Sequence, residues 1–228
     1  ALIKTQLETF APGTREWALN RFDKWASAEN RERRVLILAA PAGLGKTTIA
    51  SKIAHERSDI VVASHFCRHD DSRANNPKQM LLSLAYQIAG KFPEYSSRLL
   101  SIVEDRQLTN ADLLSEKHNL VAIFNMLLKV PLASMPLPES SHHVILIDAL
   151  DECQHDGKAT ILDCIQRHFV NLPSWLRLFV TTRPETQIMD KLKKFNPMLI
   201  DQKEADNLRL AALLSSAIRR PLVAGRWF

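Results

Sequence analysis

The segment that most constrains this chain is a short loop between an apolar run and a helix-forming run. Residues 40–47 read APAGLGKT, directly after the apolar run Val35–Ala39, and the helix-forming residues begin at Lys46. A buried strand, a tight glycine-containing loop and a helix start therefore follow one another. Such a loop directs backbone N–H groups inward at the positive end of a helix dipole. The segment predicts a phosphate-binding loop in an α/β fold.

The loop nearly fits the Walker A pattern G-x-x-x-x-G-K-[ST], with Ala40 in place of the first glycine. In that pattern the lysine, here Lys46, reaches the β- and γ-phosphates, and the hydroxyl, here of Thr47, holds Mg²⁺. We expect eight consecutive residues to bind the phosphates: Pro41, Ala42, Gly43, Leu44, Gly45, Lys46, Thr47 and Thr48. Ala40 would weaken this binding if its position required a positive φ.

Length and cysteine usage limit the class of protein. The 228 residues suffice for one large α/β domain, or for one domain with a small appendage. No apolar run approaches the roughly 20 residues that span a bilayer, and the N-terminus lacks the shape of a signal peptide. Three cysteines (Cys67, Cys153 and Cys164) form no paired framework, which favours a reducing, cytoplasmic setting. We expect the chain to be part of a longer protein.

The net charge of +5 is concentrated toward the C-terminus. From Lys191 onward there are eight Lys or Arg and three Asp or Glu, and the remainder of the chain is balanced. A basic tail can contact nucleic acid or acidic lipid. We favour a solvated helix face, or a face that packs on a neighbouring domain, and keep nucleic-acid binding as the alternative.

Hydrophobic periodicity predicts strands that alternate with helices. The predicted strands are Val35–Ala39, Ile60–Cys67, Val144–Ile147, Leu176–Val180 and Met198–Ile200. The predicted helices are Thr14–Ala26, Lys46–Glu56, Pro77–Gly90, Pro93–Val103, Ala111–Val130, Asp156–Val170, Pro184–Leu192 and Ala205–Arg219. Three prolines predict a loop at Pro131–Ser141. The alternation indicates a parallel sheet with right-handed crossovers.

A second group of candidate residues follows the predicted strand Val144–Ile147, which leads into Asp148. Ligands bind at the carboxyl ends of parallel strands, and Mg²⁺ prefers hard oxygen ligands, so we expect Asp148 to position Mg²⁺ together with Thr47. The alternative for Asp148 is an ordinary helix cap. Asp151 and Glu152 add carboxylates near the γ-phosphate, where one of them can orient or deprotonate the attacking water. Glu152 is favoured, and Asp151 is nearly as suitable.

A third group follows the predicted strand Leu176–Val180, which delivers Thr182 and Arg183 to the same edge of the sheet. An arginine there can sense the γ-phosphate and stabilise charge during phosphoryl transfer. The alternative is an ion pair between Arg183 and a nearby acidic residue. His65, Cys67 and His69 alternate at strand spacing, but no fourth ligand stands at a familiar zinc spacing.

Together the segments APAGLGKTT, VILIDALDEC and LRLFVTTRPE, in that order, resemble the NACHT family within the STAND class of signal-transduction NTPases. The resemblance covers roughly Pro12 to Asp206. It implies a P-loop NTPase fold, a three-layer αβα sandwich with a five-stranded, mainly parallel sheet of strand order 5-1-4-3-2. It also implies a helical run-in at residues 1–34, an NTPase core at 35–202, and a C-terminal helix at 203–228 that leads toward a following domain.

The same resemblance implies ATP or ADP with Mg²⁺ as cofactors, and ATP or dATP more than GTP. By this analogy ADP holds an inactive form, ATP permits self-association, and slow hydrolysis acts as a timer. The catalytic candidates are then Lys46, Asp151, Glu152 and Arg183.

Two departures from the family pattern, Ala40 and the lack of a recognisable winged-helix segment after Arg220, predict loose binding and slow hydrolysis. Three alternatives remain open. They are an AAA-like ATPase that acts on nucleic acid, a module that binds nucleotide without cleaving it, and a small-molecule kinase, the last disfavoured because no substrate lid is recognisable.

Overall fold

One five-stranded sheet forms the centre of the molecule. The structure is a computed structural model, and it describes residues 5, 16–29, 32–133, 135–136, 142–153 and 160–200. Every pair of neighbouring strands is parallel, and the strand order is β2-β3-β4-β1-β5. The strands are β1 (Val35–Ala39), β2 (Val61–Phe66), β3 (His143–Asp148), β4 (Leu176–Thr182) and β5 (Met198–Ile200). The predicted order 5-1-4-3-2 is this order reversed, so the predicted fold class is confirmed, with a sheet that is wholly parallel.

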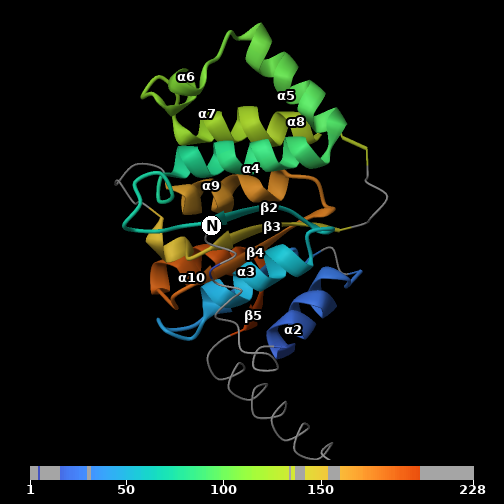
Figure 1. The fold of residues 1–228 in the computed structure, drawn as a ribbon, viewed down its shortest axis with the longest axis vertical. Helices are drawn as coiled ribbons and strands as arrows, with labels where there is room; N and C mark the ends of the chain where they lie inside the picture. Colours follow the sequence, from blue (N-terminus) through green and yellow to red (C-terminus); the bar gives the residue numbers. More distant parts are fainter. Residues whose placement is uncertain are drawn as a thin grey trace, which may run out of the picture.

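Helices cover both faces of the sheet (Figure 1). One face carries α2 (Glu16–Ala26) and α3 (Lys46–Glu56). The helices packed on the opposite face are α4 (Pro77–Lys91), α9 (Ile161–His168) and α10 (Thr186–Leu192). Further from the sheet, beyond α4, lie α5 (Pro93–Asp105), α6 (Asn110–Leu114), α7 (Leu120–Phe124) and α8 (Val130–Ala133).

The strand β1 shows how the sequence divides the core between these layers. All five of its residues are buried. Val35, Ile37 and Ala39 join the larger core under α4 and α9, whereas Leu36 and Leu38 join the smaller core under α2 and α3. Alternate side chains of a strand point to opposite faces, so a strand covered on both faces must be apolar throughout.

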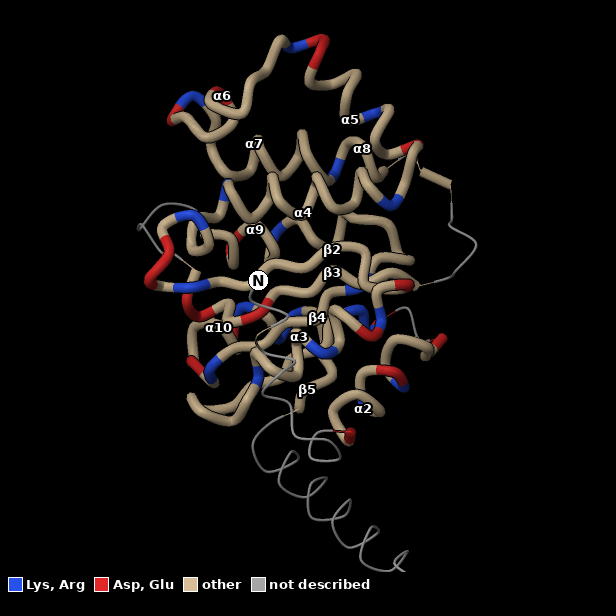
Figure 2. The backbone as a smooth tube through the Cα atoms, in the orientation of Figure 1, with Lys and Arg blue, Asp and Glu red and all other residues tan. Residues whose placement is uncertain are grey.

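Charged residues lie mostly on the helices and loops, with both signs interspersed (Figure 2). Inside the sheet the two exceptions are Asp148 at the end of β3 and Arg177 in β4, and both are buried. The guanidinium of Arg177 donates to the carbonyl oxygens of Trp25 and Ala28 and lies over the Trp25 ring, 5.4 Å from its centroid. Arg177 therefore anchors the C-terminal end of α2 to the sheet.

The predicted single helix Ala111–Val130 is wrong. The chain instead forms α6, a non-helical segment and α7, followed by a π-helical turn at Asn125–Lys129 and then α8. The break follows from a local cap, because the side chain of Asn119 accepts a hydrogen bond of 2.8 Å from the backbone N–H of Ala122.

The predicted loop at Pro131–Ser141 begins too early, because α8 continues through Pro131 to Ala133. A proline has no N–H, so the carbonyl four residues earlier, that of Leu127, loses its usual helical donor. The hydroxyl of Tyr95 in α5 donates to that carbonyl. A side chain from another helix thus replaces the missing backbone hydrogen bond.

Several predicted features lie outside the described residues. They are the helix Ala205–Arg219, the basic C-terminal tail beyond residue 200, and the predicted helix starts at Thr14 and Asp156. Within the described ranges α9 begins at Ile161, after a capping box between Thr160 and Asp163. None of the helices in these ranges combines the length and apolar character that crossing a bilayer requires.

Candidate functional site

The loop between β1 and α3, residues 40–45, turns sharply through two glycines. Gly43 has φ +83°, and Gly45 has φ 75° and caps the N-terminus of α3. Such conformations strain any residue with a Cβ atom. Ala40 is buried and is not among the described non-glycine residues with positive φ. The backbone reason for expecting weaker binding from Ala40 therefore does not apply.

The N-terminus of α3 faces the space beside this loop. The first backbone N–H to bond back to the helix cap is that of Ile49, which donates to Gly45 O over 3.0 Å. In an α-helix the N–H groups of the first turn have no intrahelical acceptor and carry the positive end of the helix dipole. The residues Lys46 and Thr47 stand in this turn, so the local geometry suits an anion.

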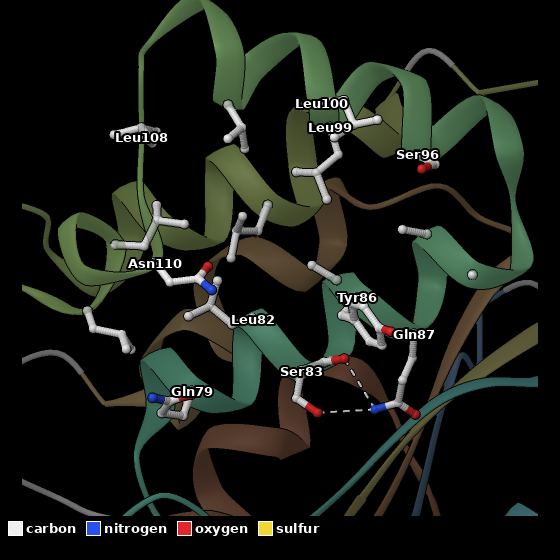
Figure 3. A pocket seen from close by; sticks show the side chains of 17 residues that line it. Gln79, Leu82, Ser83, Tyr86, Gln87, Ser96, Leu99, Leu100, Leu108 and Asn110 are labelled. Atoms are coloured by element: carbon white, nitrogen blue, oxygen red, sulfur yellow. Dashed lines mark hydrogen bonds between the residues drawn. The ribbon is translucent and has the colours of Figure 1, made fainter.

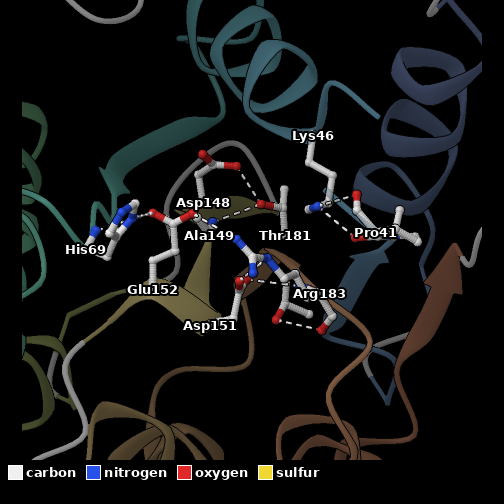
Figure 4. Close-up of polar contacts among 11 residues, drawn as sticks. Pro41, Lys46, His69, Asp148, Ala149, Asp151, Glu152, Thr181 and Arg183 are labelled. Atoms are coloured by element: carbon white, nitrogen blue, oxygen red, sulfur yellow. Dashed lines mark hydrogen bonds and ion pairs between the residues drawn. The ribbon is translucent and has the colours of Figure 1, made fainter. Parts of the chain in front are cut away.

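The ammonium group of Lys46 lies against the loop itself. Its Nζ donates to Ala40 O over 2.7 Å and to Pro41 O over 3.0 Å (Figure 4). Burial lowers the pKa of Lys46, and the negative charges of Asp151 and Asp148 oppose this. An ammonium has three donors, so two bonds to carbonyls still allow a third acceptor.

Asp148 ends β3 as a buried carboxylate, with an exposed fraction of 1%. The hydroxyl of Thr181 in β4 donates to its Oδ1 (Figure 4). Burial raises the pKa of Asp148, and hydrogen bonds from Thr181 and Thr47 and the charge of Lys46 counteract the rise. A carboxylate and a hydroxyl from two different elements therefore face each other beside the lysine.

The residues after Asp148 form a tight turn that carries two further carboxylates. Ala149 has the left-handed backbone (φ 54°, ψ 51°), and Leu150–Glu152 forms one 3-10 turn. Asp151 Oδ1 accepts the backbone N–H of Arg183 over 2.9 Å, and its Oδ2 lies 3.1 Å from Arg183 Nε. The ion pair that was the alternative for Arg183 is thus present.

Glu152 lies between two basic side chains. Its Oε2 is 3.2 Å from His69 Nδ1 and 3.3 Å from the His69 backbone N, and its Oε1 is 3.8 Å from Arg183 Nη2 (Figure 4). The side chain of Glu152 is 26% exposed, whereas that of Asp151 is only 4% exposed. Glu152 is therefore the more accessible of the two carboxylates.

These groups surround a cavity of about 300 Å³ at the carboxyl edge of the sheet. Its lining residues come from the β1–α3 loop, α3, the acidic turn and β4: Ala42, Gly43, Gly45, Lys46, Thr47, Thr48, Ala149, Asp151, Glu152 and Arg183. Of the predicted phosphate-binding residues, Pro41 and Leu44 do not line it. Asp148 is not itself a lining residue, and its buried carboxylate is hydrogen-bonded to Thr47, which lines the cavity, and to Thr181.

The residues present fit a metal-bound polyphosphate. The helix N-terminus and Lys46 provide positive potential for an anion, and the Thr47 hydroxyl and Asp148 carboxylate are the hard oxygen donors that Mg²⁺ prefers. No group of three or more His, Cys, Asp or Glu side chains among the described residues has the arrangement of a metal site. Thr47 and Asp148 offer two protein oxygen donors, and Mg²⁺ held by one or two protein groups takes its other ligands from phosphate oxygens and water.

A larger groove of about 830 Å³ lies between α4, α5 and α6 (Figure 3). Leucines and Val103 form much of its lining, and its polar members are neutral, among them Ser83, Gln79 and Asn110. Since none of the described residues that line the groove is Lys, Arg, Asp or Glu, they provide no charge that would hold phosphates. The smaller cavity is therefore the candidate for a charged ligand.

Two residues of this neighbourhood were not among the predicted site residues. Thr181 joins the site because β4 extends to Thr182, two residues beyond the predicted strand. His69 joins it from the segment after β2, and nothing in the sequence indicated its pairing with Glu152. His65 points elsewhere, since its Nε2 bonds to Ala74 O over 2.8 Å, and Cys67 is buried.

Comparison with known proteins places this site within a family. A family model described as "Nephrocystin 3, N-terminal" matches residues 13–183, well over half of the chain. No curated protein matches the chain. The matched stretch begins ahead of α2 and ends at Arg183, so it contains every residue that lines the cavity. The chain belongs to the nephrocystin 3 N-terminal family.

Proposed function

We propose that this domain binds Mg-ATP and Mg-ADP in the 300 Å³ cavity and acts as a nucleotide-controlled switch with slow hydrolysis. The observation that carries the proposal is the convergence of Lys46, Asp148 and Arg183, from three distant parts of the chain, on one edge of a parallel sheet. Parallel α/β sheets bind their ligands at this edge. The order of the three motifs, similar to that of NACHT-type NTPases, supports the same function.

The phosphates would be held by the N-terminal turn of α3 and by Lys46. The ammonium group lies within reach of loop carbonyls on one side and has Asp148, Asp151 and Glu152 near enough to influence its pKa on the other. Exchange of one carbonyl for a phosphate oxygen would keep its donors satisfied and neutralise part of the ligand charge. Mg²⁺, when bound through Thr47 and Asp148, supplies further neutralisation of the phosphate charge.

For hydrolysis the geometry supports Glu152 over Asp151 as the residue that orients the attacking water. Asp151 is nearly fully buried and is bonded to both the backbone and the side chain of Arg183. Glu152 is more exposed and lines the same cavity. Asp151 would then hold Arg183 in place, and Arg183 would stabilise charge on the γ-phosphate.

Isothermal titration calorimetry with ATP and with ADP tests this proposal. We expect the wild type to bind both in the presence of Mg²⁺ and Lys46→Ala to lose binding. Lys52→Ala removes a lysine from the same helix, where it pairs with Glu56 outside the cavity, and should bind like the wild type. Equal affinity of the wild type and Lys46→Ala would contradict the assignment of the site.

The switch function requires a second readout. We propose that ATP, in contrast to ADP, promotes self-association, which sedimentation velocity with each nucleotide would detect as a change in oligomer size. Binding without phosphate release and without a size change would instead support a binding-only module. A salt-dependent mobility shift of labelled DNA or RNA would support the nucleic-acid ATPase.

A further inference from the structure

The side chain of Thr181 joins two neighbouring groups of the candidate site. Thr181 is fully buried, with an exposed fraction of 0%. Its hydroxyl donates to Asp148 Oδ1 and accepts the backbone N–H of Ala149 over 2.9 Å (Figure 4). A single hydroxyl in β4 thus contacts both the carboxylate that ends β3 and the first peptide of the acidic turn.

One of these contacts, the one to Ala149, is made where the backbone has an unusual conformation. Ala149 is one of three described non-glycine residues with positive φ. Residues with a Cβ atom seldom adopt this conformation unless neighbouring contacts hold them in it. The bond from its N–H to Thr181 is such a contact, and the turn that follows carries Asp151 and Glu152 to the cavity.

Threonine is well suited to this position because a hydroxyl donates and accepts at the same time. A buried carboxylate such as that of Asp148 must be hydrogen-bonded, and here hydroxyls approach it from two sides. Thr181 approaches from the sheet, and Thr47 approaches from α3. Residues that orient a metal ligand from behind control metal affinity although they do not touch the metal.

We propose that Thr181 is a positioning residue, whose hydroxyl fixes the Asp148 carboxylate for Mg²⁺ and holds the Ala149 turn in register with it. This inference rests on the proposed nucleotide-binding function and deepens it. It predicts that Thr181 acts on the Mg²⁺-dependent part of nucleotide binding. The Mg²⁺-independent part depends on the β1–α3 loop and Lys46, whereas the hydroxyl of Thr181 bonds to Asp148 and Ala149.

Calorimetric titration with ADP, once with Mg²⁺ and once with EDTA, separates these two parts. We compare the wild type with Thr181→Val, which keeps the branched shape but loses the hydroxyl, and with Thr181→Ser, which keeps the hydroxyl. Mg²⁺ raises the affinity for ADP by some factor in the wild type, and this factor should be about 10 to 100 times smaller in the valine variant, as expected when a partner of a metal ligand is lost. Its affinity in EDTA should stay close to that of the wild type, and the serine variant should restore the gain.

The outcomes distinguish this inference from the proposed function. A wild type that binds no ADP overturns both. If the wild type binds ADP and Mg²⁺ raises the ADP affinity of Thr181→Val as much as that of the wild type, only the positioning role is overturned. Equal losses with Mg²⁺ and with EDTA indicate a merely structural role and also overturn it. If the valine variant does not fold, Thr181→Cys replaces it, and the Mg²⁺ gain should fall in the order Thr, Ser, Cys because a thiol is a weak donor.

Discussion

At the scale of single residues, the β1–α3 loop depends on backbone conformations that few residues adopt. Gly43 has φ +83°, and a Cβ atom built there would meet nothing within 4 Å. Any cost of a side chain at this position is therefore conformational strain and not a steric clash. Gly90, near the end of α4, has equally open surroundings but no positive φ.

The two glycines give a matched pair of substitutions with opposite expected signs. Gly43→Ala should destabilise the fold by about 1–2 kcal/mol because alanine is strained in the left-handed region. Gly90→Ala should stabilise it by up to about 1 kcal/mol because alanine is the better helix former. Urea unfolding measures both, and a stabilising Gly43→Ala would show that the loop does not need its left-handed turn.

Glu152 and Asp151 are adjacent, but their contacts assign them different tasks. We expect Glu152→Gln to keep nucleotide affinity and to slow phosphate release by about 10²-fold or more, since a positioned base typically contributes that much. Phosphate release under single-turnover conditions measures it. If Glu152→Gln leaves the rate of phosphate release unchanged and Asp151→Asn lowers it, then Asp151, and not Glu152, orients the attacking water.

At the scale of elements, Tyr95 supports an irregular part of the outer helical layer. Its hydroxyl donates to Leu127 O, which is the carbonyl that Pro131 cannot serve. Burial also raises the pKa of Tyr95 well above its ordinary value, so the phenol stays protonated and remains a donor.

Tyr95→Phe should therefore destabilise the protein by about 1–3 kcal/mol, because it leaves a buried carbonyl without its donor. Tyr86→Phe is the control, since that side chain is 81% exposed and should change stability by less than about 0.5 kcal/mol. Pro131→Ala restores a backbone N–H near the carbonyl. A double-mutant cycle compares the changes in unfolding free energy caused by Tyr95→Phe and Pro131→Ala. Strictly additive changes would show that the Tyr95 hydroxyl does not replace the N–H that Pro131 lacks.

The contact between α9 and α10 gives a prediction about pH. Burial alone would raise the pKa of Asp163, but hydrogen bonds from Lys191 and Thr160 outweigh it and lower the pKa to about 2. A lowered carboxyl pKa stabilises the fold fully above its unfolded value of about 3.9 and loses this effect as pH falls toward 2.

We expect Asp163→Asn to be less stable than the wild type by about 1 kcal/mol at neutral pH, a modest value because the ion pair with Lys191 is partly exposed. This difference should shrink between pH 4 and pH 2 in urea unfolding series. When Asp163→Asn is introduced into a Lys191→Met background, the loss of stability that it causes should be smaller at every pH, because the ion pair is already absent. A difference that does not change with pH would mean that the charge of Asp163 contributes nothing.

The elements differ in how far the sequence predicts them. The boundaries of β1, α3 and β5 are as predicted, because apolar strands and a glycine-containing loop before a helix are strong local signals. The interrupted segment from α6 to α8 was missed. Its break has a local signal, the cap at Asn119, but the carbonyl of Leu127, which Pro131 cannot serve, accepts a hydrogen bond from Tyr95 in a helix distant in sequence. Periodicity carries no information about such a contact.

At the scale of the whole molecule, the parallel sheet explains why the candidate site could be predicted in outline. The segments that follow β1, β3 and β4 must meet at one edge, so Lys46, Asp148 and Arg183 converge as expected for ligand sites of this fold. Side-chain partners could not be predicted. The pairing of Glu152 with His69 and of Asp148 with Thr181 depends on strand register and loop path, which no local pattern specifies.

The central claim is that the β1–α3 loop and the acidic turn together bind one Mg-nucleotide. Its most direct measurement is the unfolding free energy of the wild type and of Lys46→Ala, with and without Mg-ADP at about 100 times its dissociation constant. Binding to the folded state alone should stabilise the wild type by about 2.7 kcal/mol and leave Lys46→Ala unchanged. Equal stabilisation of both proteins, or of neither, would contradict the account.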